Sequence, residues 1–93
     1  MTVGILRVRL LVRGARSLKD KRQVLRGVTD RLKGTYNVSV AEVGDRDQYQ
    51  LIELGIAAVG TEDYSARDCL DKIQSQLRAH PVAEYLGGEV EYV

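Results

Sequence analysis

The sequence predicts a single α+β domain in which two helices cover one face of a four-stranded antiparallel sheet. Two patterns support this fold class: apolar residues alternate in four short segments, and they recur at helical spacing in two longer ones. A length of 93 residues with 44% hydrophobic content is typical of one domain with one core. The expected order is strand, helix, strand, strand, helix, strand, which defines the ferredoxin-like βαββαβ sandwich.

The first strand and the first helix have the clearest signals. Leucine and valine alternate with arginine over residues 6–12, as in a strand with one buried face. Ser17 and Asp20 have the spacing of a capping box, in which the serine oxygen accepts a first-turn N–H and the carboxylate reaches back to the cap. We therefore expect a helix over about residues 18–33, ended by Gly34.

The middle of the chain predicts a β-hairpin. A second strand begins at Val38, and residues 44–48 form a turn into a third strand over residues 49–59. Pairing Val43 with Tyr49 places the apolar side chains of both strands on one face of the sheet.

The last third predicts a helix and a final strand. The second helix begins near Thr61 and is stopped by Pro81, and its apolar stripe includes Cys69. We expect Cys69 to be a core thiol. A loop ending in Gly87 and Gly88 leads to a short closing strand over residues 89–93.

Charge is distributed unevenly along the chain. Residues 7–33 contain ten basic and two acidic side chains, a balance of +8, whereas residues 34–93 carry a balance of −7. This asymmetry suggests a charged partner for the first third. The alternative is that the two portions neutralise each other once the chain folds.

One lysine of the first helix lies in an unexpected place. Helical projection puts Lys21 in the middle of the apolar stripe, among Val24, Leu25, Val28 and Leu32. Its side chain either extends past the stripe to water or is aimed at an anion or carboxylate near the helix start. If it extends to water, Lys21→Met should be neutral or stabilising.

Several segments together resemble a known family. They are Gly-Ala-Arg-Ser-Leu-Lys-Asp-Lys-Arg at 14–22, Arg-Leu at 31–32, Tyr-Asn-Val-Ser-Val-Ala-Glu-Val at 36–43 and Leu-Gly-Ile-Ala at 54–57. The chain is identified by them as similar to the YlxP-like family of small bacterial proteins, the domain of unknown function 503. The resemblance implies a ferredoxin-like fold and no established reaction. It also implies gene neighbours that encode translation and ribosome-maturation factors.

The most basic part of the chain is the candidate binding surface. Four cations of the first helix project to one side, where they are able to follow a phosphate backbone. The candidate nucleic-acid or anion contacts are Arg13, Arg16, Lys19, Lys21, Arg22, Arg26 and Lys33. Lys21 would orient the loop or complete an anion pocket at the helix start. The simpler explanation of the stripe is a solvated helix face.

The uncovered face of the sheet suggests an alternative function. Arg7 and Arg9 of the first strand are expected there beside Glu53, Glu89 and Glu91 of the two flanking strands, where they form a charge ladder. The chain has no Phe and no Trp, so this face lacks the stacking platform of single-stranded RNA binders. The apolar side chains interspersed on it, which would serve a homodimer interface, are Val3, Ile5, Leu11 and Leu51.

We thus expect a non-enzymatic cytoplasmic protein without cofactor, metal or membrane partner. Its expected partner is ribosomal RNA or a ribosome-associated complex, with a homo-oligomeric module as the alternative and a small-anion sensor as a weaker one. His80 is expected to be a helix-end residue, and Asp45 and Asp47 to be turn residues. A single cysteine allows no internal disulfide, and no apolar run is long enough for a membrane span or a signal peptide.

Overall fold

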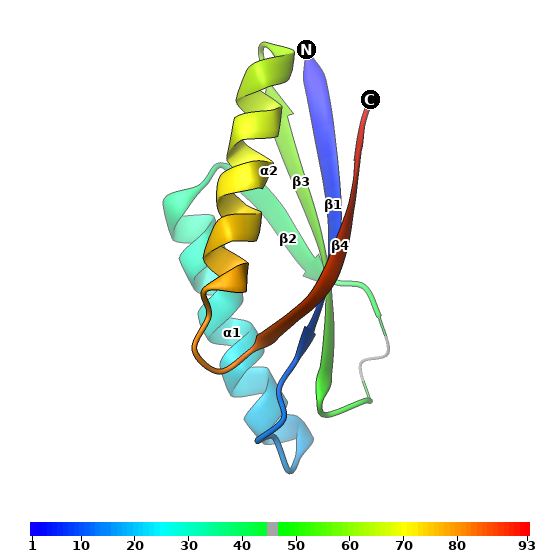
Figure 1. Ribbon diagram of the computed structural model, residues 1–93, viewed down its shortest axis with the longest axis vertical. Coiled ribbons are helices and arrows are strands. Elements are labelled where there is room, and N and C mark those ends of the chain that lie inside the picture. The colour runs from blue at the N-terminus through cyan, green and yellow to red at the C-terminus, as the bar shows by residue number, and fades with distance from the viewer. Residues whose placement is uncertain (45–46) are drawn as a thin grey trace.

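The computed structural model describes residues 1–44 and 47–93 and confirms the ferredoxin-like sandwich. Its elements are β1 (Thr2–Leu11), α1 (Leu18–Thr35), β2 (Val38–Glu42), β3 (Leu51–Gly60), α2 (Asp63–Arg78) and β4 (Glu84–Tyr92) (Figure 1). The four strands form one antiparallel sheet in the order β2-β3-β1-β4, so β1 and β3 are central, as predicted. Among the described residues, no helix is long and apolar enough to cross a membrane.

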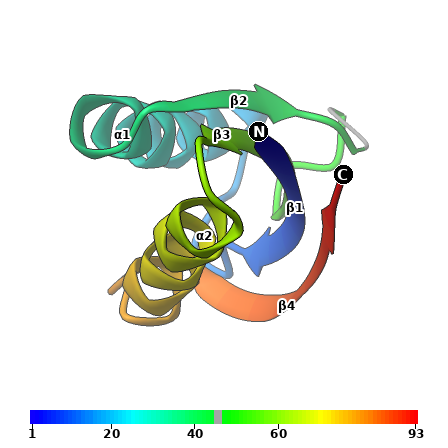
Figure 2. The same cartoon turned by 90° about the horizontal axis from the view of Figure 1, so that it is seen from above.

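The core lies between the sheet and the two helices. The sheet curves, and both helices lie on its concave side (Figure 2). Helix α1 packs chiefly against β2, and α2 packs against β3 and β1. Alternate residues of β1 and β3 point into this layer, and the side chains that are fully buried there are Leu6, Val8, Leu10, Ile52, Leu54, Leu70 and Ile73. The opposite face of the sheet has no helix over it.

Helix α1 begins as predicted but ends later. Asp20 N–H donates to Ser17 Oγ at 3.2 Å, and the Asp20 carboxylate accepts from the N–H of Arg16, at 2.9 Å, instead of from Ser17 itself. The predicted stop at Gly34 is wrong, because no described glycine has a positive φ. The helix continues until Tyr36, whose extended backbone leads directly into β2.

Lys21 is buried beneath the β2–β3 connection. Its side chain is 1% exposed, and its Nζ lies 2.8 Å from Oε2 of Glu42. The same Nζ donates to the carbonyl oxygen of Gln48 at 2.7 Å. Of the two explanations that the sequence allowed, extension to water is therefore wrong and the carboxylate partner is confirmed. Glu42 faces inward because it continues the alternation of Val38 and Val40 on β2.

The hairpin register differs from the predicted one by four residues. Val43 donates its N–H to the carbonyl oxygen of Glu53, at 2.9 Å, instead of pairing with Tyr49. The inward faces of both strands remain as predicted, because a shift by an even number of residues keeps every side chain on its side. The segment before β3 is held elsewhere: the carbonyl oxygen of Gln50 accepts the N–H of Val12 at 2.7 Å.

Strand β4 begins five residues earlier than predicted, at Glu84 instead of within 89–93. The glycine that suggested a loop is needed inside the strand. A Cβ on Gly88 would lie 2.5 Å from the Tyr85 hydroxyl, so a larger residue at this position would require the Tyr85 side chain to shift. The Tyr85 hydroxyl then donates to Oε1 of Gln74 on α2, at 3.1 Å.

The ion pair between Lys21 and Glu42 predicts a strong dependence of stability on both partners. Replacing Lys21 by methionine leaves the Glu42 carboxylate, whose side chain is only 12% exposed, without its ammonium. We expect Lys21→Met to lower the free energy of unfolding by about 3 kcal/mol. Urea denaturation followed by circular dichroism measures it.

The matched control is the double variant Lys21→Met/Glu42→Leu, which removes both charges and fills the space with apolar atoms. Its stability should lie within about 1 kcal/mol of the wild-type protein. A neutral Lys21→Met variant, or strictly additive losses in the double variant, would show that the two charges do not depend on each other.

Candidate nucleic-acid interface

Part of the basic first third is neutralised within the fold. Ion pairs between described residues join it to the acidic remainder of the chain. They include Arg7–Glu53 at 3.6 Å, Arg9–Glu89 at 3.7 Å, Arg13–Glu84 at 2.8 Å and Lys21–Glu42 at 2.8 Å. The basic residues of these pairs lie on β1 (Arg7 and Arg9), in the loop after β1 (Arg13) or in the core (Lys21).

The two pairs of β1 form the predicted charge ladder on the open face. Arg7 and Arg9 pair diagonally with glutamates on the neighbouring strands β3 and β4. Their side chains are 56% and 42% exposed, so each pair contributes at most about 1 kcal/mol. They reduce the positive charge of this face without fixing the fold.

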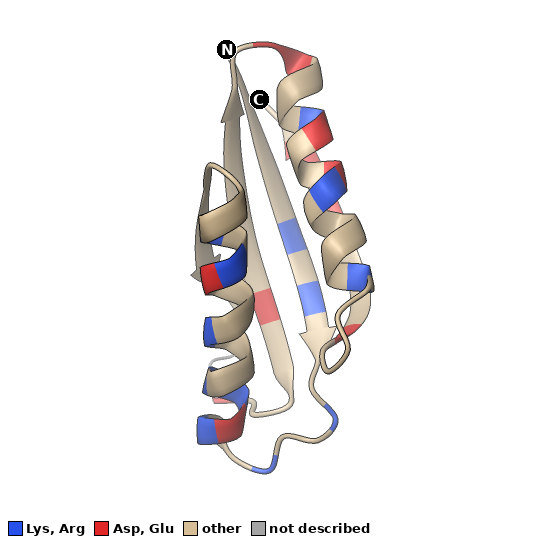
Figure 3. Cartoon of the chain, turned by 90° about the vertical axis from the view of Figure 1, so that its left-hand side faces the viewer, with Lys and Arg blue, Asp and Glu red and all other residues tan. Residues whose placement is uncertain are grey.

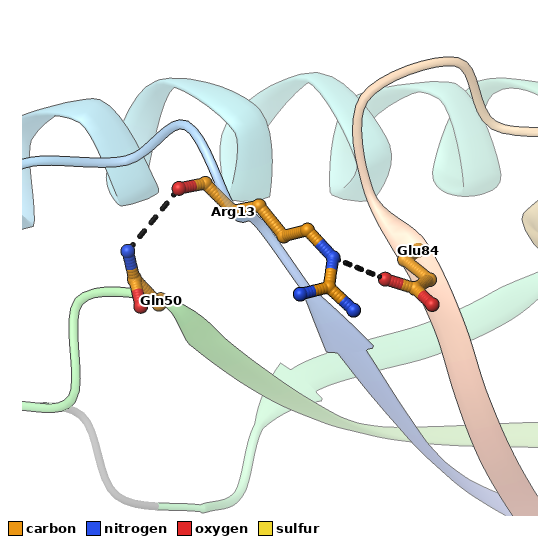
Figure 4. A network of polar contacts seen from close by, with 3 residues as sticks. All are labelled: Arg13, Gln50 and Glu84. Atoms are coloured by element: carbon orange, nitrogen blue, oxygen red, sulfur yellow. Dashed lines mark hydrogen bonds and ion pairs between the residues drawn. The ribbon is translucent and has the colours of Figure 1, made fainter.

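The loop between β1 and α1 is held from two sides (Figure 4). Nε of Arg13 donates to Oε2 of Glu84 at 2.8 Å. On the other side, Nε2 of Gln50 donates to the carbonyl oxygens of Arg13 and Ala15, at 3.2 Å and 3.3 Å. Arg13 is thus directed to β4. The sequence also predicts that the hairpin tip approaches Arg13 or Arg16; of its carboxylates, that of Asp45 lies outside the described residues.

The outward cations of α1 have a different environment. All are exposed, and within the described part of the chain none has an acidic side chain at ion-pair distance. Lys and Arg recur along α1 and in the loop before it (Figure 3). These residues are Arg16, Lys19, Arg22, Arg26 and Lys33. At a rise of about 1.5 Å per residue, the helical members extend over about 21 Å.

Two of these cations lie where they oppose the helix dipole. The N-terminal end of a helix carries a partial positive charge that favours acidic side chains. Lys19 and Arg22 lie in or next to the first turn of α1, where Asp20 is the acidic residue and its carboxylate is bound to the loop backbone. This placement does not help the helix, and so it favours a role in binding over a role in stability.

Lys21 does not belong to this surface. Its 1% exposure and its two partners keep its ammonium group inside the fold. The two roles expected for it were orientation of the loop before α1 and completion of an anion pocket at the helix start. Its contacts with Glu42 and Gln48 instead join α1 to the β2–β3 hairpin. Arg31, an exposed cation on another side of α1, is not among the contacts predicted from the sequence. It lines a hollow of about 200 Å³ between the helices together with His80.

His80 holds the turn between α2 and β4. Its Nδ1 accepts the backbone N–H groups of Val82 and Ala83, at 3.1 Å and 2.9 Å, so the expected helix-end residue also anchors the chain beyond the helix. Partial burial, followed by the nearby charge of Arg31, lowers the pKa of His80 below its usual 6.5. Both effects disfavour the protonated ring. No three His, Cys, Asp or Glu side chains gather as a metal site among the residues 1–44 and 47–93.

The lowered pKa of His80 predicts a loss of stability in mild acid. Above pH 6.5 the ring is neutral in both the folded and the unfolded chain. As the pH falls below 6.5, the unfolded chain binds the proton first, so the free energy of unfolding decreases until the pH reaches the folded-state pKa. Thermal unfolding between about pH 8 and about pH 5 measures this loss.

The control is His80→Asn, whose side-chain oxygen accepts the same N–H groups without titrating. The variant should lack the part of the pH dependence that His80 contributes. An identical pH profile in both proteins would contradict the assignment.

The fold and this surface define a small ferredoxin-like protein whose first helix carries outward cations without acidic partners among the described residues. The chain belongs to the family described as "Protein of unknown function (DUF503)", which matches residues 3–90, so the resemblance found in the motifs is confirmed. It is similar to "Uncharacterized protein YlxP" of Bacillus subtilis (strain 168), with 30% identity over 82 residues, 88% of this chain and 89% of that protein.

Among solved structures, the chain is similar to the solution NMR structure of the de novo designed protein LFR1 1 with ferredoxin fold. The TM-score is 0.47 and the identity 16%, and the match covers 100% of this chain and 83% of the designed one. The assignment of the fold rests on the chain's own strand order and connections.

Proposed function

We propose that this protein binds structured RNA, ribosomal RNA or a ribosome-associated complex, through the phosphate backbone. The proposed contacts are the outward cations of α1 and of the loop before it: Arg16, Lys19, Arg22, Arg26 and Lys33. The observation that supports the proposal is that some basic residues have an acidic partner within the fold and others do not. The arginines of β1, Arg13 and the buried Lys21 have acidic partners within the chain, whereas Arg16 and the outward cations of α1 have none among the described residues.

The shape and composition of α1 favour backbone recognition over base recognition. The helix is a straight rod with cations on its outward side and contains no aromatic residue in its sequence LKDKRQVLRGVTDRLKGT. Single-stranded RNA is usually bound by stacking its bases on aromatic side chains, which neither α1 nor the open sheet face provides. Basic side chains on a rigid helix position a phosphate backbone without reading its sequence. Structured RNA with a regular backbone fits this arrangement.

The choice of ribosomal RNA rests on the gene neighbours that the family resemblance implies, which encode translation and ribosome-maturation factors. The small-anion alternative has less support, because Lys21 is enclosed with Glu42 and does not face a ligand at the helix start.

Additive phosphate contacts predict a change in salt dependence. If Arg22 and Arg26 each neutralise one phosphate, Arg22→Ala/Arg26→Ala should reduce the slope of log K against log salt by about 2. Affinity should fall by a similar factor for RNA stems of different sequence. Fluorescence anisotropy with a labelled RNA hairpin, over a series of salt concentrations, measures both quantities.

The control variant is Arg67→Ala/Lys72→Ala, which removes two exposed cations from α2 and changes the net charge equally. Its slope should match that of the wild-type protein. Arg22→Ala/Arg26→Ala should be as stable as the wild-type protein within about 0.5 kcal/mol, since these side chains are on the surface. The control variant also loses the contact of Arg67 with the Tyr92 ring and the Lys72–Asp68 ion pair, so thermal unfolding is used to verify that it is folded. Equal slopes for all three proteins would mean that the α1 stripe is a solvated helix face.

A further inference from the structure

The hollow between the two helices has room for a small molecule. Helix α1 lies chiefly over β2 and α2 over β3 and β1, and the hollow is between α1 and the end of α2 (Figure 3). Its volume is about 200 Å³, whereas a cavity of about 150 Å³ is large enough to hold benzene. Part of its wall is apolar and consists of Val28, Leu32, Leu77 and Pro81.

The polar side chains that line the hollow have their acceptor atoms engaged within the fold and retain their donors. These side chains are Arg31, Gln76 and His80. Oε1 of Gln76 accepts the hydroxyl of Tyr36 at 2.9 Å, which leaves its Nε2 amide group as a donor. Nδ1 of His80 accepts two backbone N–H groups, so the neutral ring carries its proton on Nε2. No acidic side chain is among the described residues around the hollow.

The charge of Arg31 is not compensated within the part of the chain that the structure describes. No acidic side chain there lies at ion-pair distance from its guanidinium group. The guanidinium lies close enough to His80 to be, after burial, the second cause of the lowered pKa of that ring. The end of α2 does not replace a carboxylate, because the carbonyl oxygens of Gln76 and Leu77 already accept backbone N–H groups.

Gly27 leaves space beside Arg31. It lies one turn before Arg31 on α1, and both residues line the hollow. A Cβ at this position would meet nothing within 4 Å, and its φ is not positive, so neither packing nor backbone conformation requires glycine here. Glycine is less favourable than alanine inside a helix. The missing side chain therefore weakens α1 and keeps the hollow open.

We propose that this hollow binds a small carboxylate that carries an apolar group. The carboxylate accepts hydrogen bonds from the Arg31 guanidinium and from Nε2–H of His80, and the apolar group contacts the wall that includes Leu77 and Pro81. One guanidinium group matches a monoanion, and its planar donors bind a carboxylate through two parallel hydrogen bonds. The site lies toward the end of α1, away from the anion pocket that the sequence suggested at the helix start.

The experiment is titration of the whole chain with benzoate, followed by two-dimensional amide NMR in the absence of RNA. At a pH above 6.5, where the His80 ring is neutral, benzoate should shift the signals of the residues that line the hollow. Binding should be saturable, with a dissociation constant of about 1 mM or lower. Benzamide has the same shape without the charge and should bind at least about 10-fold more weakly.

Two variants test the two parts of the site. Arg31→Gln removes the charge and should weaken benzoate binding at least about 10-fold. Gly27→Leu fills the hollow, keeps every donor and should weaken binding in the same direction. The control is Arg9→Gln, which makes the same change of net charge on the open face of the sheet, at an exposed ion pair. It should bind benzoate like the wild-type protein, and thermal unfolding verifies that all three variants are folded.

Three results would overturn the proposal. The first is wild-type protein without saturable shifts up to about 20 mM benzoate, including the case in which inorganic phosphate binds instead. The second is equal affinity for benzoate and benzamide. The third is benzoate binding that both Arg31→Gln and Gly27→Leu leave unchanged. Because no RNA is present, none of these results bears on the RNA proposal.

Discussion

The burial of the Lys21 ammonium group is the constraint on which the arrangement of the molecule depends. Removing an ammonium ion from water costs several kcal/mol unless a charge and a hydrogen-bond acceptor replace the solvent. Here Glu42 at the end of β2 supplies the charge, and the carbonyl of Gln48 in the β2–β3 connection supplies the acceptor. The apolar face of α1 is therefore compatible with the sheet only when this connection lies over the start of the helix. The ion pair thus couples the position of α1 to that of the hairpin.

This coupling also determines which cations remain outside. Lys21 is the cation of α1 that points inward, and its charge is compensated within the fold. The cations of β1 and Arg13 find glutamates on the adjacent strands, so the charge asymmetry of the sequence is partly removed by folding. The positive charge that is not compensated is concentrated on α1. Two of its cations lie near the N-terminal end of the helix, where they oppose the helix dipole. The two surfaces of the molecule then differ in chemistry: α1 presents cations, and the open sheet face presents apolar side chains with charges of both signs.

The fold and the outward side of α1 were predictable from the sequence, because the hydrophobic period alone determines which face of each element is buried. The period does not determine strand register, since shifting Val43 by four residues changes no face. The hydrophobic period also does not show which charged residues form ion pairs when they are far apart in the sequence. Glu84 was not recognised as the partner of Arg13, because β4 was expected to begin after Gly88. One feature of the sequence did point to the partner of Lys21. Glu42 continues the alternation of Val38 and Val40, so its carboxylate is expected on the inward face of the strand.

The central claim is that the cations of α1 bind the phosphate backbone of RNA in ribosomal particles. The most direct measurement is sedimentation of the endogenous protein with ribosomal particles from a cell extract, at low and at raised salt. The account predicts that the protein sediments with the particles at low salt and is released when the salt is raised, because each phosphate contact releases counterions. A protein that stays in the supernatant at both salt concentrations, or that remains bound regardless of salt, would contradict the account.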